Sequence, residues 1–184
     1  MKNDYILTEC LNKTVLDLGC ASNDLHDKIN SVAKSVTGVD IIPKDIQGDV
    51  ERLHEAIEIR GKMYDVIVAG DIIEHLFNPG MFLTGLKPFC RADTKIIITT
   101  PNAMSLYYFW PTLWRGEEIC RDDHTCWYTM RTLCQLLEMK GFSVTSKFYT
   151  DDLQVNGLRP LVRRLFHKLF PHMGYRLIVT CNEE

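Results

Sequence analysis

Short apolar runs alternate along this chain with longer stretches of helical spacing. The runs are rich in Val, Ile and Thr, and they predict strands at 14–18, 35–40, 64–70 and 95–100. Helices are expected between them, at 24–34, 51–60 and 79–90. The last two runs are apolar throughout, which is typical of parallel strands buried on both faces. This alternation predicts an α/β protein with a doubly wound, Rossmann-like sheet.

The C-terminal part continues the pattern. A helix is expected at 129–140, ending at Gly141, and two further strands at 142–149 and 175–181. The sequence has no internal repeat and no low-complexity linker. Its 184 residues are therefore expected to form a single domain, 1–184.

Composition narrows the class of protein. No apolar run is long enough for a membrane span, and the first residues lack the apolar core of a secretory signal. The seven cysteines contain no C-x-x-C pair, so reduced thiols and a cytoplasmic location are expected. The net charge is −3, and Lys and Arg are concentrated without any acid in residues 158–176. An acidic body with one basic segment does not favour a nucleic-acid partner.

The stretch "TVLDLGCASNDLHDKI", residues 14–29, predicts a strand, a turn and a helix. In open α/β sheets, ligands bind beyond the carboxyl ends of the strands, at turns of this kind. Such turns usually contain several glycines, but this one has only Gly19. The residues Ala21 and Asn23 stand where further glycines would be, since the first is small and the second tolerates positive φ.

Three acids indicate which ligand the turn would hold. Asp17 precedes the glycine, where a carboxylate suits an ammonium group and disfavours a pyrophosphate. Asp40 ends the second strand, where an acid can bind both hydroxyls of a ribose. Asp49, in "GDV", could meet an adenine amino group. Ammonium, ribose and adenine together describe S-adenosylmethionine, and an NAD-dependent oxidoreductase is disfavoured.

At these positions the sequence resembles class I S-adenosylmethionine-dependent methyltransferases, in particular the small subgroup with "EHL" after the fourth strand. The matching pieces are "VLDLGCASND", "GVDI", "GDV", "YDVIVAGDIIEHLFNPG", "IIITTPNAMSL" and a tract from His124 to Phe142. The resemblance implies a seven-stranded sheet in the order 3-2-1-4-5-7-6 with strand 7 antiparallel. The implied cofactor-binding residues are Asp17, Gly19, Cys20, Ala21, Asp40, Ile41, Asp49, Val50 and Gly70.

Candidate bases follow the fourth and fifth strands. Methyl transfer requires the acceptor to be aligned and, where it carries a proton, deprotonated. Histidine titrates near neutrality, so His75 and His124 are the candidate catalytic residues on the acceptor side. Alternatively, Glu74 and His75 only begin a helix and serve its structure.

A metal-dependent alternative uses the same residues. The pattern "DIIEH" with a later "DDH" also resembles the small-RNA 2′-O-methyltransferases of the Hen type, which hold a divalent metal. The matching ligands would be Asp71, Glu74, His75 and His124. Asp71 stands where that family has Glu, and the chain lacks a basic face, so no metal is expected.

Residues 101–128 are rich in aromatic side chains, which either pack in the core or line an acceptor pocket. The sequence therefore predicts a methyltransferase that acts on an oxygen of a small-molecule acceptor, such as a sugar, a lipid-linked or an aromatic compound. A monomer or homodimer is expected. The rival hypothesis from another class is a non-catalytic module that binds S-adenosylmethionine or a partner.

The basic segment 158–170 has helical spacing, with apolar residues on one face and Arg163, Arg164 and Lys168 on the other. A solvated amphipathic helix is the first interpretation. Peripheral contact with an anionic membrane, or with an acidic partner, is the alternative.

Overall fold

The computed structural model describes residues 2–20, 24–42, 44–151 and 168–184. Seven strands form one sheet in the order β3-β2-β1-β4-β5-β7-β6. All neighbours are parallel except β7, which runs antiparallel to β5 and β6. This confirms the predicted sheet. The strands are β1 (Thr14–Leu18), β2 (Ser35–Asp40), β3 (Ile46–Gln47), β4 (Val66–Gly70), β5 (Lys95–Pro101), β6 (Phe142–Thr150) and β7 (Arg176–Glu183).

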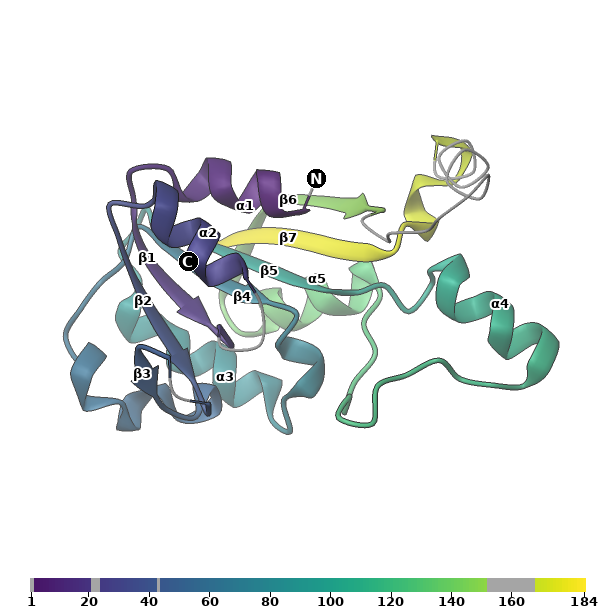
Figure 1. The fold of residues 1–184 in the computed structure, drawn as a ribbon, viewed down its shortest axis with the longest axis horizontal. Helices are drawn as coiled ribbons and strands as arrows, with labels where there is room; N and C mark the ends of the chain where they lie inside the picture. Colours follow the sequence, from purple (N-terminus) through teal and green to yellow (C-terminus); the bar gives the residue numbers. More distant parts are fainter. Residues whose placement is uncertain (1, 21–23, 43, 152–167) are drawn as a thin grey trace.

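Helices cover both faces of the sheet (Figure 1). The α-helices are α1 (Lys2–Cys10), α2 (Leu25–Val32), α3 (Pro79–Leu86), α4 (Leu106–Arg115) and α5 (Met130–Met139). Short 3-10 helices occur at Val50–Glu55, Ile57–Ile59, Ile73–His75, Lys87–Phe89 and Pro171–Met173. In Figure 1, α1 and α2 lie on one side of the sheet and α3 and α5 on the other, while α4 extends beyond the sheet.

Alternate residues of the central strands point into two separate cores. Val15, Val66 and Val68 pack with α1 and α2. Leu16 and Ile67, each adjacent in sequence to one of these, pack with α3 and α5 on the opposite face. This is the two-residue period of a strand, and both faces are apolar because both are covered by helices.

The helix expected at 51–60 is wrong in type. Two 3-10 helices, Val50–Glu55 and Ile57–Ile59, take its place. The winding is interrupted, since Arg52 leaves helical dihedral angles and Ala56 is extended between the two 3-10 helices. Val50, Leu53 and Ile59 are buried, so each of the two short helices still packs apolar side chains inward.

Other boundaries depart from expectation for local reasons. The helix expected at 79–90 ends at Leu86 and continues as a 3-10 turn over Lys87–Phe89, because Pro88 has no N–H to donate. Helices α1 and α4 were not expected. In α1, Ile6 and Cys10 lie one turn apart and are buried, whereas α4 contains a proline, Pro111, that obscures its helical pattern.

The prediction for the basic segment falls mainly outside the described residues, which resume at Lys168. Within the described ranges, no helix has both the length and the apolar character needed to cross a bilayer.

Candidate active site

The predicted cofactor residues meet at one edge of the sheet. Gly19, Asp40 and Gly70 end or follow the neighbouring strands β1, β2 and β4. The register pairs Leu18 with both Val39 and Ala69, so the three residues lie side by side. The Gly19 N–H also donates to the Val39 carbonyl at 2.9 Å. The carboxyl ends of these strands thus form the edge where α/β sheets bind ligands.

Gly19 has a backbone conformation that strongly favours glycine. Its φ is +73°, in the left-handed region. A Cβ atom there would lie 2.8 Å from Cδ1 of Ile72, closer than side chains normally approach. The single glycine of the turn is therefore required by both dihedral angle and space.

Substitution Gly19→Ala should lower the free energy of unfolding by about 2–3 kcal/mol, because left-handed strain is added to a clash with Ile72. Gly61→Ala is the matched control. Gly61 has φ +75° but nothing within 4 Å of the added Cβ, so only about 1 kcal/mol of strain is expected. Urea denaturation measures both variants, and equal losses would contradict the steric argument.

The acids expected to hold ribose and adenine lie near each other. The Asp40 carboxylate is largely buried and accepts the Ile42 N–H at 2.9 Å. Asp49 caps the first turn of the 3-10 helix through the Glu51 N–H at 2.9 Å, and its side chain is half exposed. Of the remaining residues, Ile41 is exposed and Val50 is buried. Their roles as ligands stay predictions.

Asp17 is buried beneath the turn and already has a protein partner. His26 Nδ1 lies 3.0 Å from its carboxylate, and His26 Nε2 lies 3.3 Å from Asp45. Burial raises the pKa of Asp17, and the hydrogen bond to Asp17 raises the pKa of His26. A ligand ammonium group would have to share this carboxylate with His26. Cys20 is also buried, whereas Ala21 lies outside the described residues.

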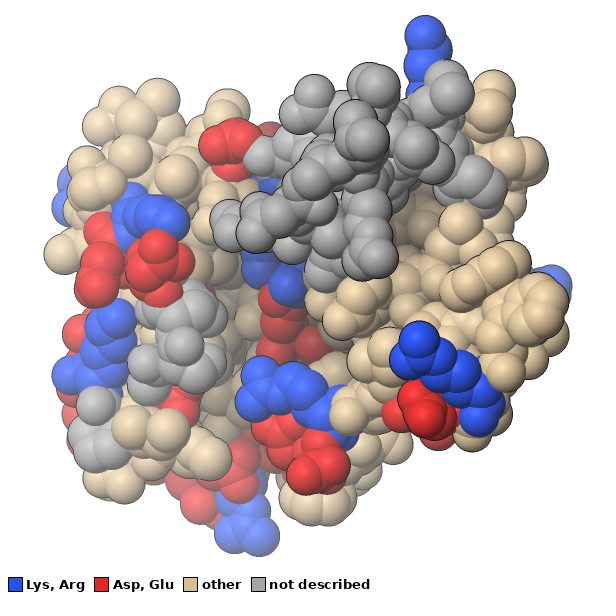
Figure 2. Space-filling model, turned by 45° about the vertical axis from the view of Figure 1, so that its right-hand side comes forward, with Lys and Arg blue, Asp and Glu red and all other residues tan. Residues whose placement is uncertain are grey.

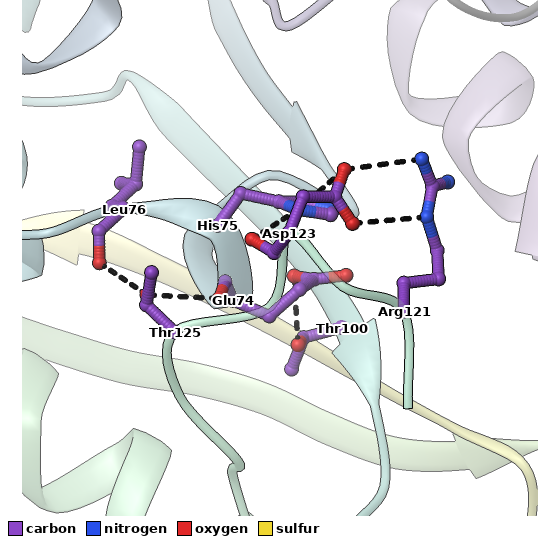
Figure 3. Close-up of polar contacts among 7 residues, drawn as sticks. All are labelled: Glu74, His75, Leu76, Thr100, Arg121, Asp123 and Thr125. Carbon is purple, nitrogen blue, oxygen red and sulfur yellow. Dashed lines mark hydrogen bonds and ion pairs between the residues drawn. The ribbon is translucent and has the colours of Figure 1, made fainter. Parts of the chain in front are cut away.

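A second group of polar side chains lies beyond β4 and β5 (Figure 3). Glu74 and His75 belong to the 3-10 turn after β4, and His124 comes from the loop between α4 and α5. One carboxylate oxygen and two ring nitrogens of these residues all lie within 4.8 Å of one another. We call Glu74, His75 and His124 the acceptor-side cluster.

Backbone hydrogen bonds bring the two loops of the acceptor-side cluster together. The carbonyl of Glu74 accepts the N–H groups of Thr125 at 2.8 Å and Cys126 at 3.1 Å. The Thr125 hydroxyl donates to the Leu76 carbonyl at 2.7 Å (Figure 3). These contacts place His124 next to His75, although Asp123, which precedes His124, is 48 positions from His75 in the sequence.

Glu74 is almost completely buried. The Thr100 hydroxyl donates to its Oε2 at 2.9 Å (Figure 3). Burial, with the nearby charge of Asp71, raises the pKa of Glu74 to about 8. The carboxyl group is therefore largely protonated at neutral pH, in contrast to an ordinary surface glutamate.

The two histidines of the cluster have different surroundings. His75 Nδ1 lies 3.2 Å from the Asp123 carbonyl, and Arg121 holds the Asp123 carboxylate through two contacts of 3.1 Å (Figure 3). His124 Nδ1 is buried and has no hydrogen-bond partner among the described residues. Burial, followed by the charge of His75, lowers the pKa of His124. Its ring meets that of His75 edge-on, with centroids 4.7 Å apart.

Asp71 does not join the acceptor-side cluster. Its φ is +54°, and its carboxylate pairs with Lys2 at 2.8 Å and with Arg176 of β7. The Thr99 hydroxyl donates to it at 3.0 Å. Burial alone would raise the pKa of Asp71, but Arg176 and Lys2 outweigh it and hold that pKa below its usual value. Of the four residues matched to metal ligands, Glu74, His75 and His124 therefore converge. Asp71, the fourth, is held by Lys2 and Arg176 instead.

Three residues that contact Asp71 or Glu74 were not predicted from the sequence, namely Lys2, Thr100 and Arg176. They come from α1, β5 and β7, and nothing in the sequence near 71–75 indicates that these distant segments reach the site. The β5–β7 register places Arg176 opposite Pro101, beside the end of β5.

The aromatic stretch 101–128 divides into two parts. Tyr108 and Trp127 are near the acceptor-side cluster, because the Trp127 ring lies 4.8 Å from Tyr108 and 5.8 Å from His124. Tyr108 also stacks on Tyr175 at 5.5 Å. The aromatic side chains further along α4 are exposed to solvent.

Comparisons with known proteins agree with this architecture. A family model described as "Methyltransferase domain" matches residues 5–147. A human relative, "Ubiquinone biosynthesis O-methyltransferase, mitochondrial", is 26% identical over 157 residues, which are 73% of this chain and 42% of that protein. The chain thus spans less than half of that relative's length.

Two solved structures illustrate the likeness of fold. A SAM-dependent methyltransferase from Archaeoglobus fulgidus has a TM-score of 0.66 at 19% identity, over 98% of this chain and 90% of that one. The small RNA methyltransferase HEN1 has a TM-score of 0.68 at 18% identity, over 100% of this chain but 25% of that one.

The chain belongs to the methyltransferase-domain family, since the family model covers most of its length. Its sheet order and its structural neighbours show that it has the fold of S-adenosylmethionine-dependent methyltransferases.

Proposed function

We propose that this protein transfers a methyl group from S-adenosylmethionine to an oxygen of a small-molecule acceptor, either aromatic or lipid-linked. The observation that carries the proposal is the acceptor-side cluster, a carboxyl group and two imidazoles beyond β4 and β5, next to the cofactor edge of the sheet. The human and rat relatives are named as O-methyltransferases of ubiquinone biosynthesis, which supports oxygen as the accepting atom.

The residues at the cofactor edge fit the proposed ligand. Gly19 lets the backbone turn tightly, and Asp40 ends the adjacent strand with a carboxylate. We infer that Gly19 and Gly70 would lie against the methionine part, with Asp40 at the ribose and Asp49 near the adenine. S-adenosylmethionine supplies, when bound, a methyl group already activated on a sulfonium sulfur.

The chain's own chemical task is to hold the acceptor and to take its proton. Donation from His75 Nδ1 to the Asp123 carbonyl requires hydrogen on Nδ1, which leaves Nε2 as the nitrogen that can accept a proton. The lowered pKa of His124 keeps its ring neutral at physiological pH. Both imidazoles can therefore act as bases when the acceptor oxygen gains a methyl group and loses its proton.

The metal-dependent alternative draws support from the same cluster. A carboxylate with two imidazoles suits a divalent ion, and the protonated Glu74 would have to lose its proton on binding one. The pairing of Asp71 with Lys2 and Arg176 supports the metal-free proposal instead, because it withdraws the fourth matched ligand.

Substitution Asp40→Ala tests the cofactor assignment. Loss of a carboxylate that binds two ribose hydroxyls should weaken the affinity for adenosylhomocysteine by roughly 30-fold or more. Isothermal calorimetry measures this, with Asp93→Ala, an exposed acid in the turn before β5, as the control. Circular dichroism checks that the fold is retained. Unchanged affinity in folded Asp40→Ala protein would contradict the assignment, and a wild-type protein that binds no adenosylhomocysteine at all would favour a non-catalytic module that binds a partner.

A further inference from the structure

Helix α4 presents large apolar side chains to solvent. None of its residues is buried, and Trp110, Leu113 and Trp114 are 56%, 61% and 70% exposed. Phe109 is exposed beside them. Spacings of three and four residues place these side chains on one face of the helix. We call Phe109, Trp110, Leu113 and Trp114 the α4 surface.

Among the described residues, only the first turn of α4 makes ring contacts with the body of the protein. Ser105 caps the helix, and the rings of Tyr107 and Tyr108 lie 5.3 Å and 5.5 Å from that of Tyr175. Trp110 and Trp114 pack against each other instead, with centroids 5.6 Å apart. The helix extends away from the sheet in Figure 1, and uncharged residues dominate the corresponding right-hand side of Figure 2.

A second exposed apolar segment is tied to the base of this helix. Leu169 and Phe170 are exposed and follow Lys168. The turn after them is bonded to Asn102, whose Nδ2 donates to the carbonyls of His172 at 3.0 Å and Gly174 at 2.8 Å. Asn102 lies just before the N-cap of α4, so the two exposed apolar segments leave the body at neighbouring points.

Basic side chains lie beside both exposed apolar segments. Arg115 ends α4, and Lys168 precedes Leu169 within residues 158–176, a stretch that contains basic residues and no acid. Two of the acids that follow α4 have partners near that helix. Glu118 accepts Trp127 Nε1 at 2.6 Å, and Glu117 lies 4.0 Å from Arg115.

We propose that the α4 surface, with residues 168–170, docks on a lipid bilayer that contains anionic lipid. Trp and Phe side chains partition into the interfacial region of a bilayer, while Arg and Lys contact the head groups. The loop that leaves α4 carries His124 of the acceptor-side cluster, so docking would bring that cluster close to the membrane surface. The binding itself does not depend on which acceptor the protein uses or on whether it methylates one.

The chain's tryptophans provide a direct test. Trp127→Phe leaves Trp110 and Trp114 as the only tryptophans of the 184 residues. Adding vesicles of phosphatidylcholine mixed with phosphatidylserine should shift their emission to the blue, and the protein should co-sediment with the vesicles. Pure phosphatidylcholine vesicles and raised salt should both weaken the binding, since the attraction to anionic lipid is screened.

Paired variants of the otherwise native chain locate the surface. Leu113→Ser with Trp114→Ser should weaken vesicle partitioning roughly tenfold or more, because two inserted apolar side chains are lost. Ile57→Ser with Met139→Ser is the matched control, since these side chains are 71% and 76% exposed elsewhere, and it should leave partitioning unchanged. Absence of a blue shift, or equal binding by the two double variants, would overturn the proposal. So would lipid-free self-association lost on Trp114→Ser, which would assign the α4 surface to a second copy of the chain.

Discussion

Replacing Glu74 with glutamine should raise the free energy of unfolding at pH 8 by on the order of 2–4 kcal/mol. Glu74 is almost fully buried, and its pKa rises from 4.5 to about 8 because burial, and then the charge of Asp71, penalises the ionised form. Above that pH the folded protein must hold a buried charge. Glutamine has the same shape, keeps an oxygen that can accept the Thr100 hydroxyl, and carries no charge.

The way in which the free energy of unfolding depends on pH sets the direction of the expected change. Between pH 4.5 and about 8, the folded protein keeps a proton on Glu74 that the unfolded chain has released. Stability from this group therefore falls as pH rises through that window, and Glu74→Gln should lack the fall. Urea denaturation at several pH values measures it, with the exposed Glu58→Gln as control. Parallel pH profiles for wild type and Glu74→Gln would show that Glu74 is ordinarily ionised in the folded state.

Substitution His75→Ala should lower kcat by roughly a hundredfold to a thousandfold, while the affinity for adenosylhomocysteine stays unchanged. The residue is expected to accept the acceptor's proton through Nε2, and it lies on the acceptor side rather than at the cofactor edge. Release of labelled methyl from S-adenosylmethionine to a panel of phenolic and lipid-linked acceptors provides the assay. His172→Ala, at an exposed histidine of the 3-10 helix Pro171–Met173, is the control.

The pH profile of the same reaction tests His124 as the base. A base acts in its neutral form, and the pKa of His124 lies below 6.5 because of burial and of His75. If His124 is the base, activity should persist as pH falls and be lost only below 6.5. Excess chelator should leave the rate unchanged. A rate abolished by chelator and restored by Mn²⁺ would instead establish the metal-dependent alternative.

The positions of the main strands could be predicted because their pattern is local, whereas the order of the strands came from the resemblance to methyltransferases. The runs at 64–70 and 95–100 are apolar throughout, as expected for burial on two faces, and the structure places β4 and β5 there within two residues. The two-residue strand β3 has no such pattern, and it was expected only through the resemblance to methyltransferases. The 3-10 helix at Val50–Glu55 depends on what the segment packs against, and the helix propensity of its residues carries no information about that packing.

The candidate site, too, could be predicted from the sequence only in part. With the strand order that the resemblance implies, Gly19, Asp40 and Gly70 could be predicted to share an edge, because carboxyl ends of neighbouring parallel strands lie together. His75 and His124 could be predicted by residue type. The burial of Glu74 beside them, and the turning of Asp71 toward Lys2 and Arg176, emerge from the folded structure alone. Those outcomes depend on contacts between segments far apart in the chain, since burial and charge pairing are properties of the packed molecule and not of its local sequence.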